Sequence, residues 1–152
     1  AHEYIFLLSK SPNYYFDNDA IKEDAKFPDG PSSPHNIKKG QGEYGMDTRG
    51  GLNKIGAIEK KNKRSVWTVT TKPFKGAHFA TFPMDLIEPC VLAGCPEYGT
   101  VLDPFAGSGT TGIVAVGHNR NAVLCELNEE YIDLAKKRIR EDAGMYAKIY
   151  EN

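Results

Sequence analysis

The stretch that decides the fold is Asp103-Pro104-Phe105-Ala106-Gly107-Ser108-Gly109-Thr110-Thr111-Gly112. Its glycines fit the pattern G-x-G-x-x-G, and the short apolar run before it predicts a strand. Glycine lets the backbone turn sharply and approach a ligand closely, which a Cβ atom would obstruct. The stretch therefore predicts a ligand-binding loop between a strand and a helix. The competing interpretation is a tight turn that binds nothing.

The residues around this loop predict the order strand, helix, strand, helix. We expect strands over residues 100–102 and 121–125, a helix over about 110–116, and a second helix after Asn128, which is a typical N-cap. Apolar residues at helical spacing form a core stripe on that last helix, namely Tyr131, Ile132, Ala135 and Ile139. A βαβα unit over residues 100–143 implies a parallel sheet and an α/β fold.

Glu126 ends the second strand and is the nineteenth residue after Gly107. A carboxylate in that position can accept hydrogen bonds from both hydroxyls of a ribose. A dinucleotide and S-adenosylmethionine both carry an adenosine ribose, so the residues leave the ligand open. A P-loop is disfavoured, because Ile113 follows Gly112 where a lysine would be required.

Two more elements are predicted upstream. Residues 83–93 suit a helix with Gly94 at its end, and Pro89 inside it should kink it or cut it short. Residues 3–8 are short and rich in aromatic and aliphatic side chains, which favours a buried strand. With residues 14–16 as the return strand, the start of the chain predicts a hairpin.

The segment between these parts has a different composition. Residues 28–34 hold three prolines and a glycine, which exclude regular structure there. Residues 38–64 carry eight Lys or Arg against three acids, a local net charge of +5. One interpretation is a solvated loop, and the other is an insert that contacts phosphates.

Composition limits the function classes. The 152 residues suit one domain, and 40% hydrophobic with 26% charged residues suits a packed core. No apolar run is long enough for a transmembrane helix, and we expect no secretory signal. Three cysteines favour a reducing cytoplasm over a disulfide scaffold. Cys90 and Cys95 near His78 match no common zinc spacing, so no metal is expected.

Three blocks together resemble the beta group of DNA amino-methyltransferases. The first is the glycine loop, residues 103–111, with Glu126 as its ribose acid. The second is His78-Phe79-Ala80-Thr81-Phe82-Pro83, which is similar to the segment that closes over the methionine end of the cofactor. The third is residues 2–10 with 14–17, which resemble a hairpin of that group. The order of the blocks is also that of the group.

The resemblance implies a Rossmann-like S-adenosylmethionine-dependent methyltransferase sheet, incomplete in this chain, with an irregular recognition insert. It divides the single domain into a hairpin (1–16), a target-recognition insert (17–65) and a cofactor-binding portion (66–152). The expected reaction is methyl transfer to the exocyclic amine of adenine (N6) or cytosine (N4) in double-stranded DNA.

The resemblance also implies two sets of site residues. The residues expected to bind the cofactor are His78, Thr81, Phe82, Pro83, Asp103, Phe105, Gly107, Ser108, Gly109, Thr110, Thr111 and Glu126. Those expected to contact DNA are Tyr14, Tyr15, Lys60, Lys61, Lys63 and Arg64. For the two tyrosines, a place in the core is an equal alternative to a wall of the pocket for the flipped base.

The sequence departs from the family at its catalytic tetrapeptide, which is Asp, Asn or Ser followed by Pro-Pro and an aromatic residue. Ser11-Pro12-Asn13-Tyr14 departs from that pattern at Asn13, and no catalytic residue is assigned. We expect the motif upstream of Ala1 or on a second chain, no activity of this chain alone, and self-association through an open sheet edge. The alternatives are a module that only binds cofactor and DNA, or a dinucleotide-dependent oxidoreductase.

Overall fold

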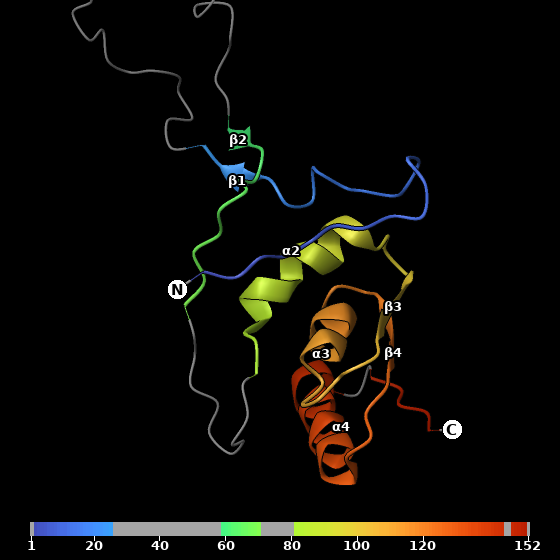
Figure 1. The fold of residues 1–152 in the computed structure, drawn as a ribbon. Helices are drawn as coiled ribbons and strands as arrows, with labels where there is room; N and C mark the ends of the chain where they lie inside the picture. Colours follow the sequence, from blue (N-terminus) through green and yellow to red (C-terminus); the bar gives the residue numbers. More distant parts are fainter. Residues whose placement is uncertain (1, 26–58, 71–80, 145–146, 152) are drawn as a thin grey trace, which may run out of the picture. The chain divides into compact units, whose positions relative to one another are not determined.

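The computed structural model describes residues 2–25, 59–70, 81–144 and 147–151. Its elements are, in order, β1 (Glu23–Asp24), β2 (Lys60–Lys61), α2 (Met84–Gly94), β3 (Thr100–Asp103), α3 (Thr110–Gly117), β4 (Asn121–Leu124) and α4 (Glu129–Ala143) (Figure 1). The chain divides into two compact units, residues 1–21 with 66–152 and residues 22–65. None of the helices among the described residues is long and apolar enough to cross a membrane.

Strands β3 and β4 lie parallel, with α3 between them in the sequence. Their register runs from Thr100 opposite Asn121 to Asp103 opposite Leu124. A parallel pair needs a crossover connection in place of a tight turn, and α3 is that crossover. The predicted order of strand, helix, strand and helix is confirmed, and the fold class of this part is α/β.

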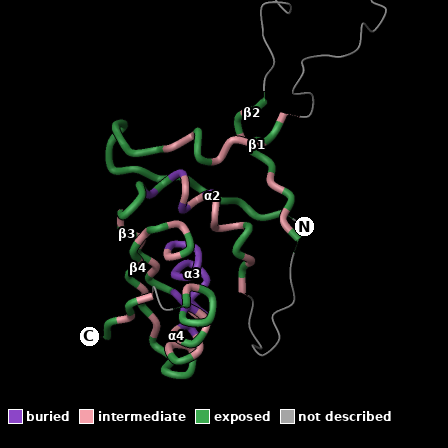
Figure 2. Tube along the Cα trace, turned by 180° about the vertical axis from the view of Figure 1, so that it is seen from behind, coloured by how far each residue is buried: buried purple, intermediate pink, exposed green. Residues whose placement is uncertain are grey.

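Helix α3 forms the centre of the core. Its sequence has no charged residue, and such a helix is typically buried on all sides. Residues Thr110 to Ala115 are all buried, and Ala115 has no exposed surface (Figure 2). Helices α2 and α4 and both parallel strands contact α3. The hydrophobic effect therefore holds β3 and β4 in place against this helix.

Helix α4 begins as predicted. The Asn128 side chain accepts a hydrogen bond from the Glu130 backbone N–H at 2.9 Å, so Asn128 is the N-cap. Ala135 and Ile139 are buried, which confirms that their stripe packs in the core. The register of α4 against α3 is thus set by its apolar face.

Helix α2 continues past Pro89 to Gly94, so the expected early end of the helix is wrong, whereas the expected kink stays a prediction. Proline removes one backbone donor, which costs one helical hydrogen bond. Pro89, Val91 and Ala93 are all buried, and α2 packs against α3. Burial of this face offsets the lost hydrogen bond.

The hairpin expected at the start of the chain is wrong in its secondary structure. Residues 2–16 contain no strand, and large side chains such as Tyr4, Phe6 and Leu8 are 75%, 77% and 87% exposed. A strand needs a neighbouring strand to pair its backbone groups, and the described strands pair only β1 with β2 and β3 with β4. The segment is tied down where the Asp17 N–H donates to the Ala93 carbonyl of α2 at 2.9 Å.

The unit of residues 22–65 contains an antiparallel ribbon that the sequence analysis did not predict. Glu23 pairs with Lys61 and Asp24 with Lys60, and the Ala25 N–H donates to the Glu59 carbonyl at 2.8 Å. Each strand of the ribbon carries one sign of charge, so cross-strand ion pairs reinforce the backbone pairing.

Candidate cofactor site

The glycine loop joins β3 to α3 and takes a shape that side chains resist. Gly107 and Gly109 have φ of +51° and +77°, in the left-handed region that favours glycine. A Cβ atom on Gly109 would lie 2.7 Å from the Cβ atom of Ala135 on α4. The loop is therefore compact and packs closely on α4, and Gly109 is also the N-cap position of α3.

Asp103 ends β3 and is held in place from two directions. One carboxylate oxygen accepts a hydrogen bond from the Thr111 hydroxyl at 2.6 Å, and the other accepts from the Phe105 backbone N–H at 3.0 Å. Thr111 is buried on the first turn of α3, so this contact ties the strand end to the helix start. The Asp103 carboxylate is thereby oriented before any ligand arrives.

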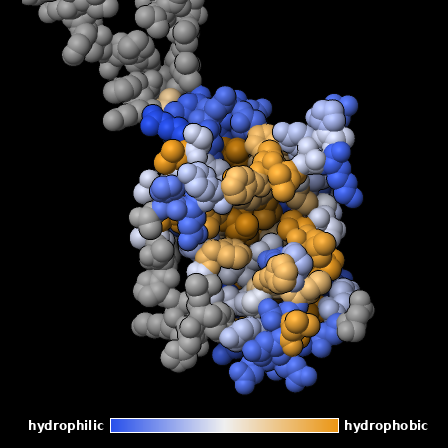
Figure 3. Space-filling view, in the orientation of Figure 1, coloured by the Kyte–Doolittle hydropathy of each residue, from blue (hydrophilic) through white to orange (hydrophobic). Residues whose placement is uncertain are grey.

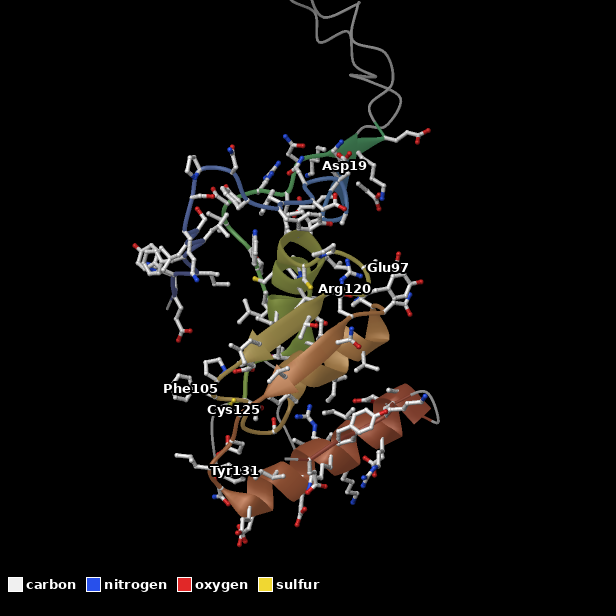
Figure 4. All side chains as sticks on the ribbon, turned by 90° about the vertical axis from the view of Figure 1, so that its right-hand side faces the viewer. Asp19, Glu97, Phe105, Arg120, Cys125 and Tyr131 are labelled. Atoms are coloured by element: carbon white, nitrogen blue, oxygen red, sulfur yellow. The ribbon has the colours of Figure 1, made fainter. Side chains whose placement is uncertain are left out.

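Phe105 is 86% exposed. Figure 4 shows Phe105 and Cys125 at the same end of the β3–β4 pair, and Glu97 and Arg120 at the opposite end. The end with Phe105 is the carboxyl end of both strands, which is where α/β sheets bind ligands. An exposed aromatic ring there is free to stack on a flat ligand group.

Glu126 closes the loop from the end of the neighbouring strand. Its Oε2 atom accepts a hydrogen bond from the Gly107 N–H at 2.8 Å, and its Oε1 atom accepts from the N–H groups of Leu127 and Asn128, each at 2.9 Å. These backbone hydrogen bonds lower the pKa of the Glu126 carboxyl, and the one from Asn128 has the largest effect. Desolvation acts in the opposite direction. The side chain is ionised at neutral pH.

The hydrogen bonds of Glu126 limit how it can bind a ribose. A carboxylate offers about four lone-pair sites, and three are occupied by backbone donors. Two ribose hydroxyls would need one of these donors to give way, and the Gly107 N–H is the one in the loop. Glu126 and the loop backbone therefore suit a vicinal diol, one hydroxyl of which takes the place of an existing backbone donor.

Three of the predicted residues before α2 lie at a cavity of about 430 Å³. Thr81, Phe82 and Pro83 line it together with Thr110 of α3. Figure 3 shows apolar residues gathered over α2 and α3 on one face of the molecule. Thr110 is the residue shared by this cavity and the glycine loop. His78 lies outside the described residues.

The lysines expected to contact DNA are engaged in ion pairs within the ribbon. Lys60 lies 2.9 Å from Asp24, whereas Lys61 and Lys63 lie 3.7 Å and 3.4 Å from Glu23. The pair with Asp24 raises the pKa of Lys60 and lowers that of its partner. Phosphate groups of DNA would have to compete with these carboxylates for the lysines. This competition is possible because surface ion pairs are weak. Arg64 is exposed on the same segment.

Tyr14 and Tyr15 are 51% and 47% exposed. A core position for these two rings, one of the two alternatives, is therefore wrong. The Tyr14 ring contacts the Phe16 ring edge to face, with centroids 6.5 Å apart. The exposed rings remain available to a partner.

One residue that contacts the glycine loop was not predicted from the sequence. Arg138 on α4 donates through its Nη1 atom to the Ser108 carbonyl and the Ser108 hydroxyl, both at 2.6 Å. The available clue was its position three residues after Ala135, next to the apolar stripe of the predicted helix. Within the described residues, no group of three His, Cys, Asp or Glu side chains is arranged to hold a metal ion.

Comparison with known proteins places this geometry in context. The sequence model of a family described as DNA methylase matches residues 1–137. The Type II methyltransferase M.SmaI of Serratia marcescens is 45% identical over 139 residues, which are 91% of this chain and 38% of that protein. The Type II methyltransferase M.Cfr9I of Citrobacter freundii is 41% identical over 146 residues, which are 95% and 39%.

A solved structure is also similar, a putative DNA modification methylase from Thermus thermophilus complexed with S-adenosyl-L-methionine. It is 40% identical, and the match covers 42% of this chain and 27% of that chain with a TM-score of 0.38. The chain spans about two fifths of the length of the two curated relatives above.

Proposed function

The chain belongs to the DNA methylase family matched over residues 1–137, and on that basis we propose that it supplies the S-adenosylmethionine-binding part of a DNA methyltransferase. The observation that carries the proposal is the hydrogen bond between Gly107 and Glu126, which joins the glycine loop to the acid at the carboxyl end of two parallel strands. The sheet is proposed to be the Rossmann-like sheet of that enzyme class, present here in part.

The site residues fit the chemical groups of the proposed cofactor. Glu126 suits the ribose hydroxyls, the exposed ring of Phe105 suits the adenine, and the oriented carboxylate of Asp103 suits the cationic amino-acid end. Thr81, Phe82, Pro83 and Thr110 would extend the pocket. When bound, the cofactor would supply an electrophilic methyl group to an amine of adenine or cytosine.

The rest of the enzyme is proposed to come from a preceding segment or a second chain. The sequence contains no Pro-Pro pair, so the family's catalytic tetrapeptide is absent from it. Leu102 and Val123 are opposite each other in the β3–β4 register, on the face away from α3, and are 64% and 50% exposed. Burial of these side chains and of the apolar run near Phe6 would drive association with the preceding segment or the second chain. The alternative is self-association of this chain through the same side chains.

The division of labour is proposed to follow the segments. Residues 66–152 would bind the cofactor, residues 17–65 would recognise DNA, and residues 1–16 would join the sheet of the complete enzyme. The paired charges of the ribbon support this, because lysines held by carboxylates can be released to phosphates without unfolding the chain.

Calorimetric titration of the 152-residue chain with S-adenosylhomocysteine tests the proposal. We expect binding by the wild type and at least about a tenfold loss of affinity in Glu126→Ala and in Asp103→Ala, because each variant removes a charged hydrogen-bond acceptor. Glu129→Ala is the matched control, an exposed acid on the first turn of α4. Unchanged affinity in both acid variants, or preferential binding of NAD, would contradict the proposal.

A further inference from the structure

The glycine loop is held from two sides by side chains of opposite charge. Glu126 accepts the Gly107 N–H at 2.8 Å, whereas Arg138 donates to the carbonyl of the next residue, Ser108, at 2.6 Å. The same guanidinium nitrogen reaches the Ser108 hydroxyl at 2.6 Å and the Thr110 hydroxyl at 3.4 Å. The loop backbone is thus fixed by one acceptor and one donor that come from different elements.

The contacts of Arg138 lie on the segment whose shape matters most for a ligand. Ser108 stands between two glycines with positive φ, so its peptide groups determine where the loop donors point. Ser108 and Thr110 are each only 3% exposed, so water cannot easily replace the guanidinium as their partner. Loss of the arginine would leave buried acceptors unsatisfied and the loop less restrained.

The charge of Arg138 is preserved although the group is partly buried. Desolvation lowers the pKa of its guanidinium, and the nearby Asp142 carboxylate acts in the opposite direction. Arginine is charged in proteins under all ordinary conditions, so the hydrogen bonds to Ser108 are charge-assisted and stronger than neutral ones. Such bonds are suited to fix a loop that contains two flexible residues.

Helix α4 brings the two restraints together. Glu126 accepts from the Leu127 and Asn128 N–H groups just before the helix, and Arg138 extends from its third turn. Ala135 lies on the same face and contacts Gly109. A shift of α4 would move the acid, the arginine and the surface under Gly109 at once.

We propose that Arg138 is a positioning residue for the cofactor: it holds the Ser108–Thr110 segment in the shape in which the loop and Glu126 accept the ligand. This inference rests on the proposed function, because the ligand is the S-adenosylmethionine assigned there. Arg138 also lines the cavity beside Phe82, and the role proposed for it is to hold the loop through Ser108.

The test compares Arg138→Met and Arg138→Lys with Lys137→Met, a neighbouring substitution whose lysine side chain is 71% exposed. We expect Arg138→Met to bind S-adenosylhomocysteine about tenfold to a hundredfold more weakly, the range for lost hydrogen bonds to a charged group. Arg138→Lys should recover part of the affinity, and Lys137→Met should bind as the wild type does.

Amide hydrogen exchange of the ligand-free chain separates positioning from general stability. Exchange in Arg138→Met should be faster at Ala106 to Gly109 and unchanged at Ala115 in the core of α3. Wild-type affinity in a folded Arg138→Met chain would overturn the inference, and so would equal acceleration at Ala115. If the wild type itself does not bind S-adenosylhomocysteine, the proposed function fails, while the exchange data still decide whether Arg138 holds the loop.

Discussion

Residues 100–143 and residues 2–16 both begin with short apolar runs, yet only the first region folds into strands. β3 has β4 beside it and α3 above it, so one edge of its backbone is paired and its side chains on the α3 side are half-buried. Residues 2–16 have no neighbouring strand among the described residues, and Phe6 is 77% exposed. An apolar run therefore specifies a strand only where a partner strand and a covering helix are present.

The largest expected effect comes from the core of the first region. Ile139 is 7% exposed, and Ile139→Ala should lower the free energy of unfolding by about 2–5 kcal/mol. Phe6→Ala, which removes a larger but exposed side chain, should change it by no more than about 0.5 kcal/mol. Urea unfolding of both variants measures the difference. A comparable loss in Phe6→Ala would mean that residues 2–16 are packed in solution, and the comparison would fail.

A second substitution tests how tightly the loop packs on α4. Gly109→Ala should destabilise the chain by about 2 kcal/mol or more, for two reasons. The positive φ is strained for a residue with a Cβ atom, and this atom would overlap the Cβ atom of Ala135. The control is Gly117→Ala at the other end of α3, where no atom lies within 4 Å of the new Cβ. Thermal unfolding should show a change of less than about 1 kcal/mol there. Equal effects at the two positions would contradict the close contact.

These contrasts also show what could be predicted from sequence. β3, α3, β4 and the N-cap Asn128 were placed correctly, because the glycine loop, an apolar helix and a helical stripe each leave a strong local pattern. The ribbon of β1 and β2 has only two residues per strand, so it shows no periodicity. Its clue was the acidic pair Glu23-Asp24 and the basic pair Lys60-Lys61.

The candidate site was predictable in its residue types and less so in its contacts. The glycine loop and Glu126 were predicted to bind one ligand together, and the Gly107 N–H donates a hydrogen bond to Glu126. Arg138 was not predicted as a site residue, because a sequence does not show which buried acceptors a long side chain will reach. The cavity beside Phe82 likewise depends on how α2 packs against α3.

Glu126 should make the first region sensitive to acid. Its pKa is lowered in the folded chain, so its stabilising contribution is present above the ordinary glutamate pKa of about 4.3 and is lost as the pH falls through the lower folded value. Unfolding midpoints measured from pH 7 to about pH 3 should therefore fall more in the wild type than in Glu126→Gln. Parallel curves would show that the three backbone contacts do not stabilise the ionised form.

The smallest expected effect on stability lies in the ribbon. Glu23→Gln with Asp24→Asn should leave the unfolding midpoint almost unchanged, because exposed ion pairs contribute little. The same change should strengthen DNA binding, since it releases Lys60, Lys61 and Lys63 to phosphates. Replacing these lysines with Gln should reduce the slope of log K against log salt by about 0.9 per lost contact.

The control for both ribbon variants is S-adenosylhomocysteine affinity, which should not change. Weaker DNA binding after loss of the acids would contradict the proposed release of the lysines. A change in cofactor affinity would contradict the proposal that cofactor and DNA are bound by different residues.

The central claim is that the cofactor binds where the glycine loop meets Glu126. Its most direct test is titration of the nitrogen-15-labelled chain with S-adenosylhomocysteine, followed by NMR of the backbone amides. The Gly107, Leu127 and Asn128 amides, which donate to Glu126, should shift most, and the amides of Lys60 and Lys61 should stay in place. Shifts confined to the ribbon, or saturation of the chain without any shift at Gly107, would contradict the claim.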